Sequence, residues 1–202
     1  METIFSIIIL IFSVVIHEFS HGYAADKLGD PTARLAGRLT LNPFAHLSLF
    51  GSFIFPLITY SLGGFIFGWA KPVPYNPYNI RHKYGDAIVA VAGPGSNFLL
   101  AVIFGVLIRL NVAYGLFPSP FIDVFALIVV INIILGIFNL IPIPPLDGSK
   151  ILFNFLPVRY LFIKDFLEKY WPVFAFILVF FLWKFILPLV HLIFSLITGI
   201  AV

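Results

Sequence analysis

The chain of 202 residues contains no cysteine and few charged residues. Without cysteine it has no disulfide framework, no thiolate nucleophile and no thiolate metal ligand. Only 10% of the residues are charged and 61% are hydrophobic, whereas about 25% are charged in a soluble globular protein. Too few polar side chains are present to cover a surface that faces water. The composition therefore predicts an integral membrane protein.

The apolar residues gather in five blocks, each long enough for a spanning helix of about 20 residues. The blocks cover residues 3–25, 47–69, 87–108, 121–143 and 172–202. The first block lacks the basic segment and the small-residue cleavage site of a signal peptide, so we expect it to remain as a helix. No polar stretch between the blocks is long enough to fold into a soluble regulatory domain. We therefore expect one α-helical polytopic membrane domain over residues 1–202.

The basic residues bear on how the second block, residues 47–69, sits in the membrane. All of the twelve Lys and Arg except Arg109 and Lys184 flank this block or lie between the fourth and fifth blocks. Cytoplasmic loops collect Lys and Arg. These residues share one side only if the second block enters the membrane and returns, which its glycines and Pro56 would permit beside protein or a wet cavity. The alternative is a helix that crosses the membrane.

The first block contains the motif His-Glu-Phe-Ser-His at residues 17–21. Ionisable residues are expensive inside a bilayer and usually pair, line a cavity or do chemistry. Residues four apart share a helix face, so His17 and His21 can present two imidazoles to one ion. Glu18 is turned by about 100° and can reach a metal-bound water instead. The motif predicts a zinc site with Glu18 as general base; the alternative is a buried histidine pair that Glu18 satisfies.

A third zinc ligand has to come from elsewhere, and Asp147 is the best candidate. It follows a run with three prolines at residues 142–145, which cannot continue a helix and hold the chain extended. Two histidines and one carboxylate form a catalytic zinc set. Asp147 as a helix N-cap is an alternative, and His191 in the last block stays open as a ligand. His46 and His82 flank loops and favour an interfacial position.

Together, "HEFSH" in a first membrane helix and "NLIPIPPLDG" after a later one resemble the site-2 protease family of zinc intramembrane metalloproteases. The resemblance is to its compact branch, without a PDZ domain. It implies one zinc per chain, bound by His17, His21 and Asp147. It implies catalytic roles for Glu18 and for Asn139, the latter in substrate or oxyanion binding.

A third motif, "AGPGSN" at residues 92–97, is similar to the G-P-x-x-N motif of the same family. The resemblance maps substrate or structural support to Gly93, Pro94 and Asn97. It implies a catalytic core at about residues 4–150, with three helices around the zinc and a small membrane-associated β element. A C-terminal helical segment follows at residues 151–202.

The expected β element would use two strand-like runs, residues 37–41 and 69–76. An extended substrate could join them as an added strand. In the fourth block, Asn132, Gly136 and Asn139 share a helix face, which we expect to look at the metal site. Interhelical hydrogen bonding alone is the other explanation for Asn132.

The combined prediction is a zinc-dependent endopeptidase that cleaves membrane-protein or membrane-associated peptide substrates within or near the bilayer. We expect it in the cell membrane, with the active site toward the cytoplasm, and we expect no nucleic-acid partner. The alternative is a non-enzymatic metal transporter or metal-binding scaffold. A transporter would place polar residues along a path through both leaflets, whereas the outer half of the expected bundle is nearly all Ile, Leu, Val and Phe.

Overall fold

The computed structural model describes residues 2–48, 50–54, 57–58, 61, 70–171, 173–174 and 183–200. Most of them are helical. The α-helices are α1 (Glu2–Lys27), α2 (Thr32–Leu35), α4 (Gly85–Tyr114), α5 (Ser119–Asn139), α6 (Asp147–Phe155), α7 (Leu161–Lys169) and α9 (Trp183–Thr198). Single 3-10 turns lie at Pro43–His46, Pro77–Asn79 and Val158–Tyr160, and a π-helical turn lies at Phe50–Ile54.

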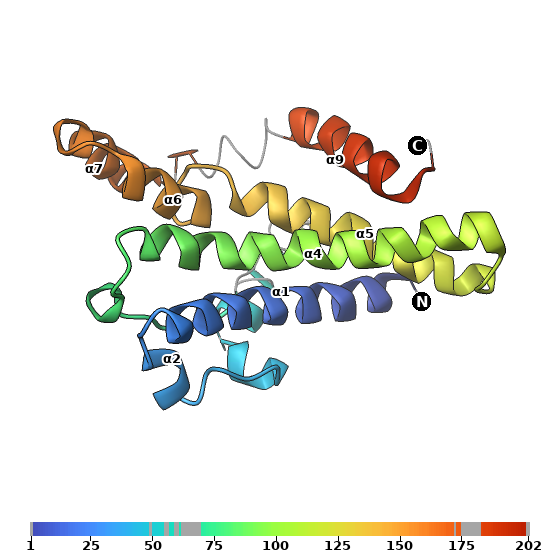
Figure 1. The fold of residues 1–202 in the computed structure, drawn as a ribbon, viewed down its shortest axis with the longest axis horizontal. Helices are drawn as coiled ribbons and strands as arrows, with labels where there is room; N and C mark the ends of the chain where they lie inside the picture. The colour runs from blue at the N-terminus through green and yellow to red at the C-terminus, as the bar shows by residue number, and fades with distance from the viewer. Residues whose placement is uncertain are drawn as a thin grey trace.

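Three of these helices are long and apolar enough to cross a membrane: α1 from Ile4, α4 and α5. They lie side by side, with α4 running opposite to α1 and α5 (Figure 1). Their exposed side chains are mainly Ile, Leu, Val and Phe, which is the surface that lipid requires. The described residues therefore confirm the prediction of an integral, mostly helical membrane protein.

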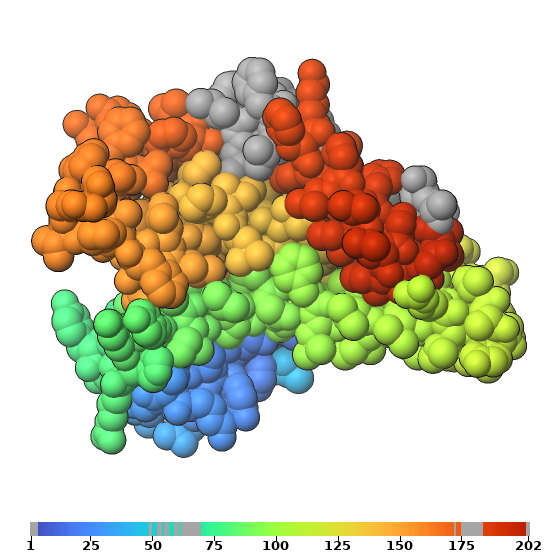
Figure 2. Space-filling model, turned by 45° about the horizontal axis from the view of Figure 1, so that its top comes forward, coloured from blue at the N-terminus to red at the C-terminus, as the bar shows by residue number. Residues whose placement is uncertain are grey.

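A large apolar core lies where α9 packs on α4 and α5, as Figure 2 shows for the contact of α9 with α4. Its buried members are Ala101, Ile108, Val129, Ile133, Ile186, Val190 and Phe194. Gly105 permits this contact, because a Cβ there would lie 2.2 Å from Cγ2 of Ile197. The C-terminal segment thus includes the expected additional helix.

The polar segments gather at one end of the three long helices, where α1 ends and α4 begins (Figure 1). Asp30 joins them, because its carboxylate accepts hydrogen bonds from Thr32, from the Asn76 N–H at 2.6 Å and from Asn79 Nδ2 at 2.8 Å. Burial raises the pKa of Asp30, but these hydrogen bonds outweigh it and hold the pKa below its ordinary value. The carboxylate fixes residues 76–79 beside the end of α1.

The expected β element does not form among the described residues, since neither run is assigned as a strand. In the second run, backbone groups that would pair with a neighbouring strand bond to other parts of the chain. The Lys71 N–H donates to the carbonyl of His46, the Val73 N–H donates to Glu18, and the Lys71 carbonyl accepts from Arg38. Pro72 and Pro74 have no N–H to donate. The His46 carbonyl and the side chains of Glu18 and Arg38 therefore bind this extended run where a neighbouring strand was expected.

Most of residues 47–69 lie outside the described residues, so the re-entrant path stays a prediction. Single cysteines at Ser48 and Tyr78 should both react only with a membrane-impermeant thiol reagent added from the cytoplasmic side. The chain has no cysteine of its own, so the background is clean. Tyr78 is 97% exposed. A cysteine at Leu116, beyond the far end of α4, serves as the control for the opposite side. Labelling of Ser48 and Tyr78 from opposite sides would instead establish a crossing helix.

Candidate metal centre

Two helices bring three side chains together that are far apart in the sequence. His17 and His21 lie on α1, and Asp147 begins α6. The Nε2 atoms of the two histidines are 3.0 Å apart, and Asp147 Oδ2 lies 3.1 Å from His17 Nε2 and 3.0 Å from His21 Nε2. All three residues are buried. Among the described residues this is the one group of three such ligands that converges on a point.

The geometry and chemistry of these atoms fit one zinc ion. Tetrahedral ligands at about 2.0–2.1 Å from zinc lie about 3.3 Å from one another, close to the separations found here. His21 Nδ1 lies 2.7 Å from the carbonyl oxygen of Val89, which can only accept. His21 Nδ1 therefore carries the hydrogen, and its Nε2 presents a lone pair to the centre. A zinc ion between this lone pair and the Asp147 carboxylate oxygen would take both as ligands.

The two oxygens of the Asp147 carboxylate face different partners. While Oδ2 faces the histidines, Oδ1 accepts from Lys150 Nζ at 3.0 Å. The cap position of α6 is held by Leu146, without a side-chain cap hydrogen bond. The alternative of Asp147 as a helix cap is therefore wrong.

Glycine is needed on both sides of the centre. A Cβ at Gly93 of α4 would lie 2.4 Å from His21 Nε2 and 2.6 Å from His17 Cε1. A Cβ at Gly148 would lie 2.2 Å from the carbonyl oxygen of Leu140. The imidazoles thus pack directly on the backbone of α4, and the start of α6 packs on the end of α5.

The remaining residues of the G-P-x-x-N motif lie next to the imidazoles. Pro94 is buried inside α4. Asn97 is fully buried, and its Oδ1 lies 2.7 Å from His17 Nδ1. Asn97 therefore contacts a proposed metal ligand directly, and its supporting role stays a prediction.

Glu18 does not satisfy the histidines. Its Oε2 accepts from the Val73 N–H at 2.8 Å, and the Nδ1 atoms of His17 and His21 have other partners. The alternative of a histidine pair stabilised by Glu18 is therefore wrong. The Glu18 carboxylate instead points to the extended run of residues 70–76, beside the centre.

The three residues predicted to share a face of α5 have different surroundings in the structure. Asn132 and Gly136 are buried, and Asn132 bonds to Asn97, so it reaches the centre through that residue. Asn139 is half-buried, and its Nδ2 donates to the carbonyl of Leu135 at 3.0 Å. Its role at the oxyanion stays a prediction.

The other histidines lie apart from the three ligands. His46 is buried, with Nε2 2.8 Å from the carbonyl oxygen of Thr40. His82 is exposed and accepts from the Tyr84 N–H. His191 is exposed on α9. None of them belongs to the converging group, and the possibility of His191 as third ligand finds no support.

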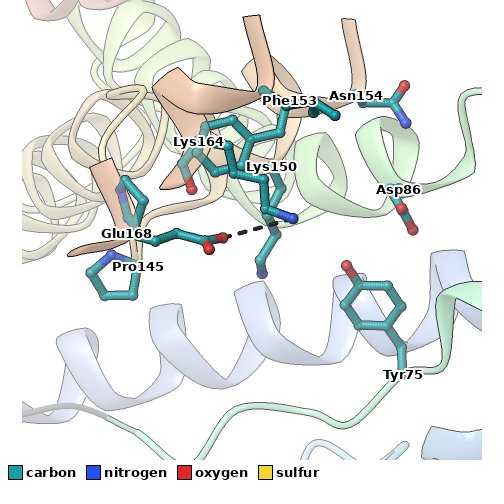
Figure 3. A pocket seen from close by; sticks show the side chains of 11 residues that line it. Tyr75, Asp86, Pro145, Lys150, Phe153, Asn154, Lys164 and Glu168 are labelled. Atoms are coloured by element: carbon teal, nitrogen blue, oxygen red, sulfur yellow. Dashed lines mark ion pairs between the residues drawn. The ribbon is translucent and has the colours of Figure 1, made fainter. Parts of the chain in front are cut away.

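A pocket of about 560 Å³ borders the centre on its polar side (Figure 3). Lys150 connects the two, because it lines the pocket and bonds to Asp147. Tyr75 faces it from the extended run. The residues that line the pocket are Tyr75, Asp86, Pro144, Pro145, Ser149, Lys150, Phe153, Asn154, Leu161, Lys164 and Glu168. The centre therefore adjoins a space that carries charges of both signs.

Sequence reasoning missed Val89, Ser13 and Lys150. Val89 acts through its backbone carbonyl, so no sequence signal reports it. Ser13 accepts a hydrogen bond from Asn132. Lys150 could have been found, because a lysine three residues after an aspartate on a helix can pair with it.

Comparison with known proteins finds similarity to a peptidase family. The model of peptidase family M50 matches residues 5–120 and 116–182. A Bacillus subtilis protein named "Putative zinc metalloprotease YwhC" is 40% identical over 157 residues, which cover 75% of this chain and 68% of that protein.

More distant relatives carry similar names. "Putative zinc metalloprotease Rip2" of Mycolicibacterium smegmatis is 33% identical over 68% of this chain, which spans 52% of that protein. "Zinc metalloprotease MJ0392" of Methanocaldococcus jannaschii is 26% identical over 78% of this chain, which spans 36% of that protein. No solved structure matches the chain. The family match and the Bacillus relative together show that the chain belongs to peptidase family M50, the family of the site-2 proteases.

Proposed function

We propose that the chain is a zinc-dependent endopeptidase that cleaves peptide bonds of its substrates within or near the membrane. The convergence of His17, His21 and Asp147 within 3.1 Å carries this proposal. Their location on the membrane-capable helix α1 and at the start of α6 supports an active site at membrane depth. The names of the relatives support zinc and proteolysis.

In this mechanism His17, His21 and Asp147 would hold one zinc, which when bound would lower the pKa of water to about 7 and polarise a carbonyl. Glu18 accepts the proton of the attacking water and delivers it to the leaving amine. The Val73 N–H orients the Glu18 carboxylate through Oε2 and leaves its other oxygen for the proton. Asn139 is proposed to steady the oxyanion.

Access to the centre is proposed from the cytoplasmic side of the cell membrane. The end of the bundle that holds the centre also holds most of the basic residues, and cytoplasmic loops collect these. Water and an unfolded stretch of substrate would enter through the pocket beside Lys150. The substrate class that fits is a membrane protein or membrane-associated peptide, since a helical segment must become extended before its amides are exposed. Besides its substrate, the protein is proposed to contact the lipid bilayer.

Zinc analysis of purified variants tests the ligand set. We expect about one zinc per wild-type chain, no zinc in His21→Ala, and strongly weakened binding in Asp147→Ala, because each change removes one of three ligands. His191→Ala is the control, since His191 is exposed and lies outside the group. Full zinc retention by Asp147→Ala would remove this residue from the ligand set.

A further inference from the structure

A chain of buried polar side chains crosses the three long helices and ends on one of the proposed zinc ligands. Ser13 lies on α1, Asn132 on α5 and Asn97 on α4, and all three are at most 3% exposed. Asn132 Nδ2 lies 2.9 Å from Ser13 Oγ, and the Asn132 and Asn97 amides are 2.9 Å apart. Asn97 then lies 2.7 Å from His17 Nδ1. The proposed catalytic steps use none of these three residues.

The contact of Asn132 with the Ile128 carbonyl oxygen fixes the direction of the hydrogen bonds from Asn132 to His17. The carbonyl oxygen of Ile128 can only accept, so the Asn132 atom 2.9 Å from it is the donor Nδ2. Asn132 Oδ1 is then the atom that faces Asn97 and accepts from its Nδ2. Asn97 must therefore turn Oδ1 toward His17. Amide orientations are assigned from such networks, and this one has a single solution.

The consequence for His17 is a fixed tautomer. Because Asn97 Oδ1 accepts, His17 Nδ1 must carry the hydrogen, and Nε2 presents its lone pair toward Asp147 and His21. We propose that Asn97 and Asn132 are positioning residues that hold His17 in the tautomer able to bind metal through Nε2. The inference rests on the proposed zinc site for its purpose, although the tautomer itself is a property of the metal-free protein.

His21 provides an internal comparison. Its Nδ1 bonds to the backbone carbonyl of Val89, which no side-chain substitution removes. His17 is therefore the one of the two histidines whose tautomer depends on side chains. A network that served only to join helices would end on any polar partner, and its loss would lower stability without selecting one histidine.

Three variants separate positioning from packing. Asn97→Leu removes the acceptor for His17 and should weaken zinc binding by about 10- to 100-fold, the range for a lost outer partner of a ligating histidine. Asn97→Asp keeps an acceptor at His17 and should bind zinc much more tightly than Asn97→Leu. Asn132→Leu leaves Asn97 Nδ2 held only by its 3.5 Å contact with the Ser13 carbonyl oxygen, and the expected loss lies near the lower end, about 10-fold. Competition with a chelator measures these affinities.

Nitrogen NMR of the metal-free protein, at a pH where the imidazoles are neutral, reads the tautomers directly. In wild type, both His17 and His21 should carry hydrogen on Nδ1. In Asn97→Leu, the His17 signals should shift toward the Nε2–H form while those of His21 stay. The control is Asn111→Leu on the same helix, whose side chain accepts from the Phe117 N–H far from the centre; both histidines and the zinc affinity should stay unchanged.

Several results would overturn the inference. They are wild-type zinc affinity in Asn97→Leu, equal losses in Asn97→Leu and Asn97→Asp, or a His17 already in the Nε2–H form in wild type. If Asn97→Leu does not fold, Asn132→Leu still tests the inference, because it should weaken zinc binding by about 10-fold and wild-type affinity would contradict it. Failure of the proposed function would give another result: wild-type protein would bind no zinc, while NMR could still show the Nδ1–H form of His17.

Discussion

Glu18→Gln is expected to abolish cleavage while zinc stays bound. General base catalysis contributes about a hundred- to ten-thousand-fold. Glu18 is also the proposed donor of the proton to the leaving amine, so we expect the loss to reach the upper end of that range. The variant should still fold and still capture substrate, because the ligands His17, His21 and Asp147 are untouched.

The contact with Val73 explains why glutamine is the appropriate replacement. The Val73 N–H requires an acceptor, so glutamine should turn its oxygen toward Val73 and its amide nitrogen toward the centre. The proton acceptor is thereby replaced by a donor of the same shape. Asp123→Asn, an exposed change at the far end of α5, is the control for the loss of an acidic group. Cleavage by Glu18→Gln at the wild-type rate would rule out the mechanism as written. Loss of zinc or of the fold would instead assign Glu18 a structural role.

Gly93→Ala is expected to remove zinc binding altogether. The added methyl group would lie 2.4 Å from His21 Nε2 and 2.6 Å from His17 Cε1. These are rings of the proposed ligands, so relief of the clash must move at least one of them out of position. Gly93 is in the helical region, and alanine in a helix is worth up to about 1 kcal/mol over glycine. A loss of zinc would therefore come from the clash and not from a weaker helix.

Gly95→Ala is the matched control, because it lies on the same helix, is exposed, and has no neighbour within 4 Å of its added Cβ. It should keep one zinc per chain and be at least as stable as wild type. Metal analysis and thermal unfolding of the two variants give the comparison. A Gly93→Ala protein with full zinc would show that the imidazoles do not pack on α4 as described.

The three long helices were predictable, since long apolar blocks allow few other structures in a membrane. His17 and His21 share a face by helix periodicity alone. Asp147 was the best candidate for the third ligand, and the structure brings it beside His21 across 126 residues; its role as a ligand stays a prediction. The β element is the expectation that the described residues do not bear out, since neither run is a strand there. Its run looks extended in the sequence, but whether a neighbouring strand or side chains such as Arg38 bind its backbone depends on tertiary contacts.

The support around the ligands was only partly predictable. Asn97 was expected to support the site through its motif, but its contact with His17 requires the packing of α1 on α4. Asn132 was predicted to face its neighbours, with two explanations open. The structure joins the two explanations, because the interhelical hydrogen bond to Asn97 is also the link to His17. The carbonyl of Val89 belongs to the backbone and leaves no mark on the sequence.

Zinc-dependent cleavage of a library of membrane-spanning peptides tests the central claim most directly. The purified protein should be assayed as isolated, after zinc removal and after zinc is restored, with new peptide ends identified by mass spectrometry. We expect cuts within or next to the spanning segment, no cuts after zinc removal, and recovery when zinc returns. Cleavage that continues in the zinc-free protein, or a zinc-loaded and folded protein that cuts no peptide in the library, would contradict the account.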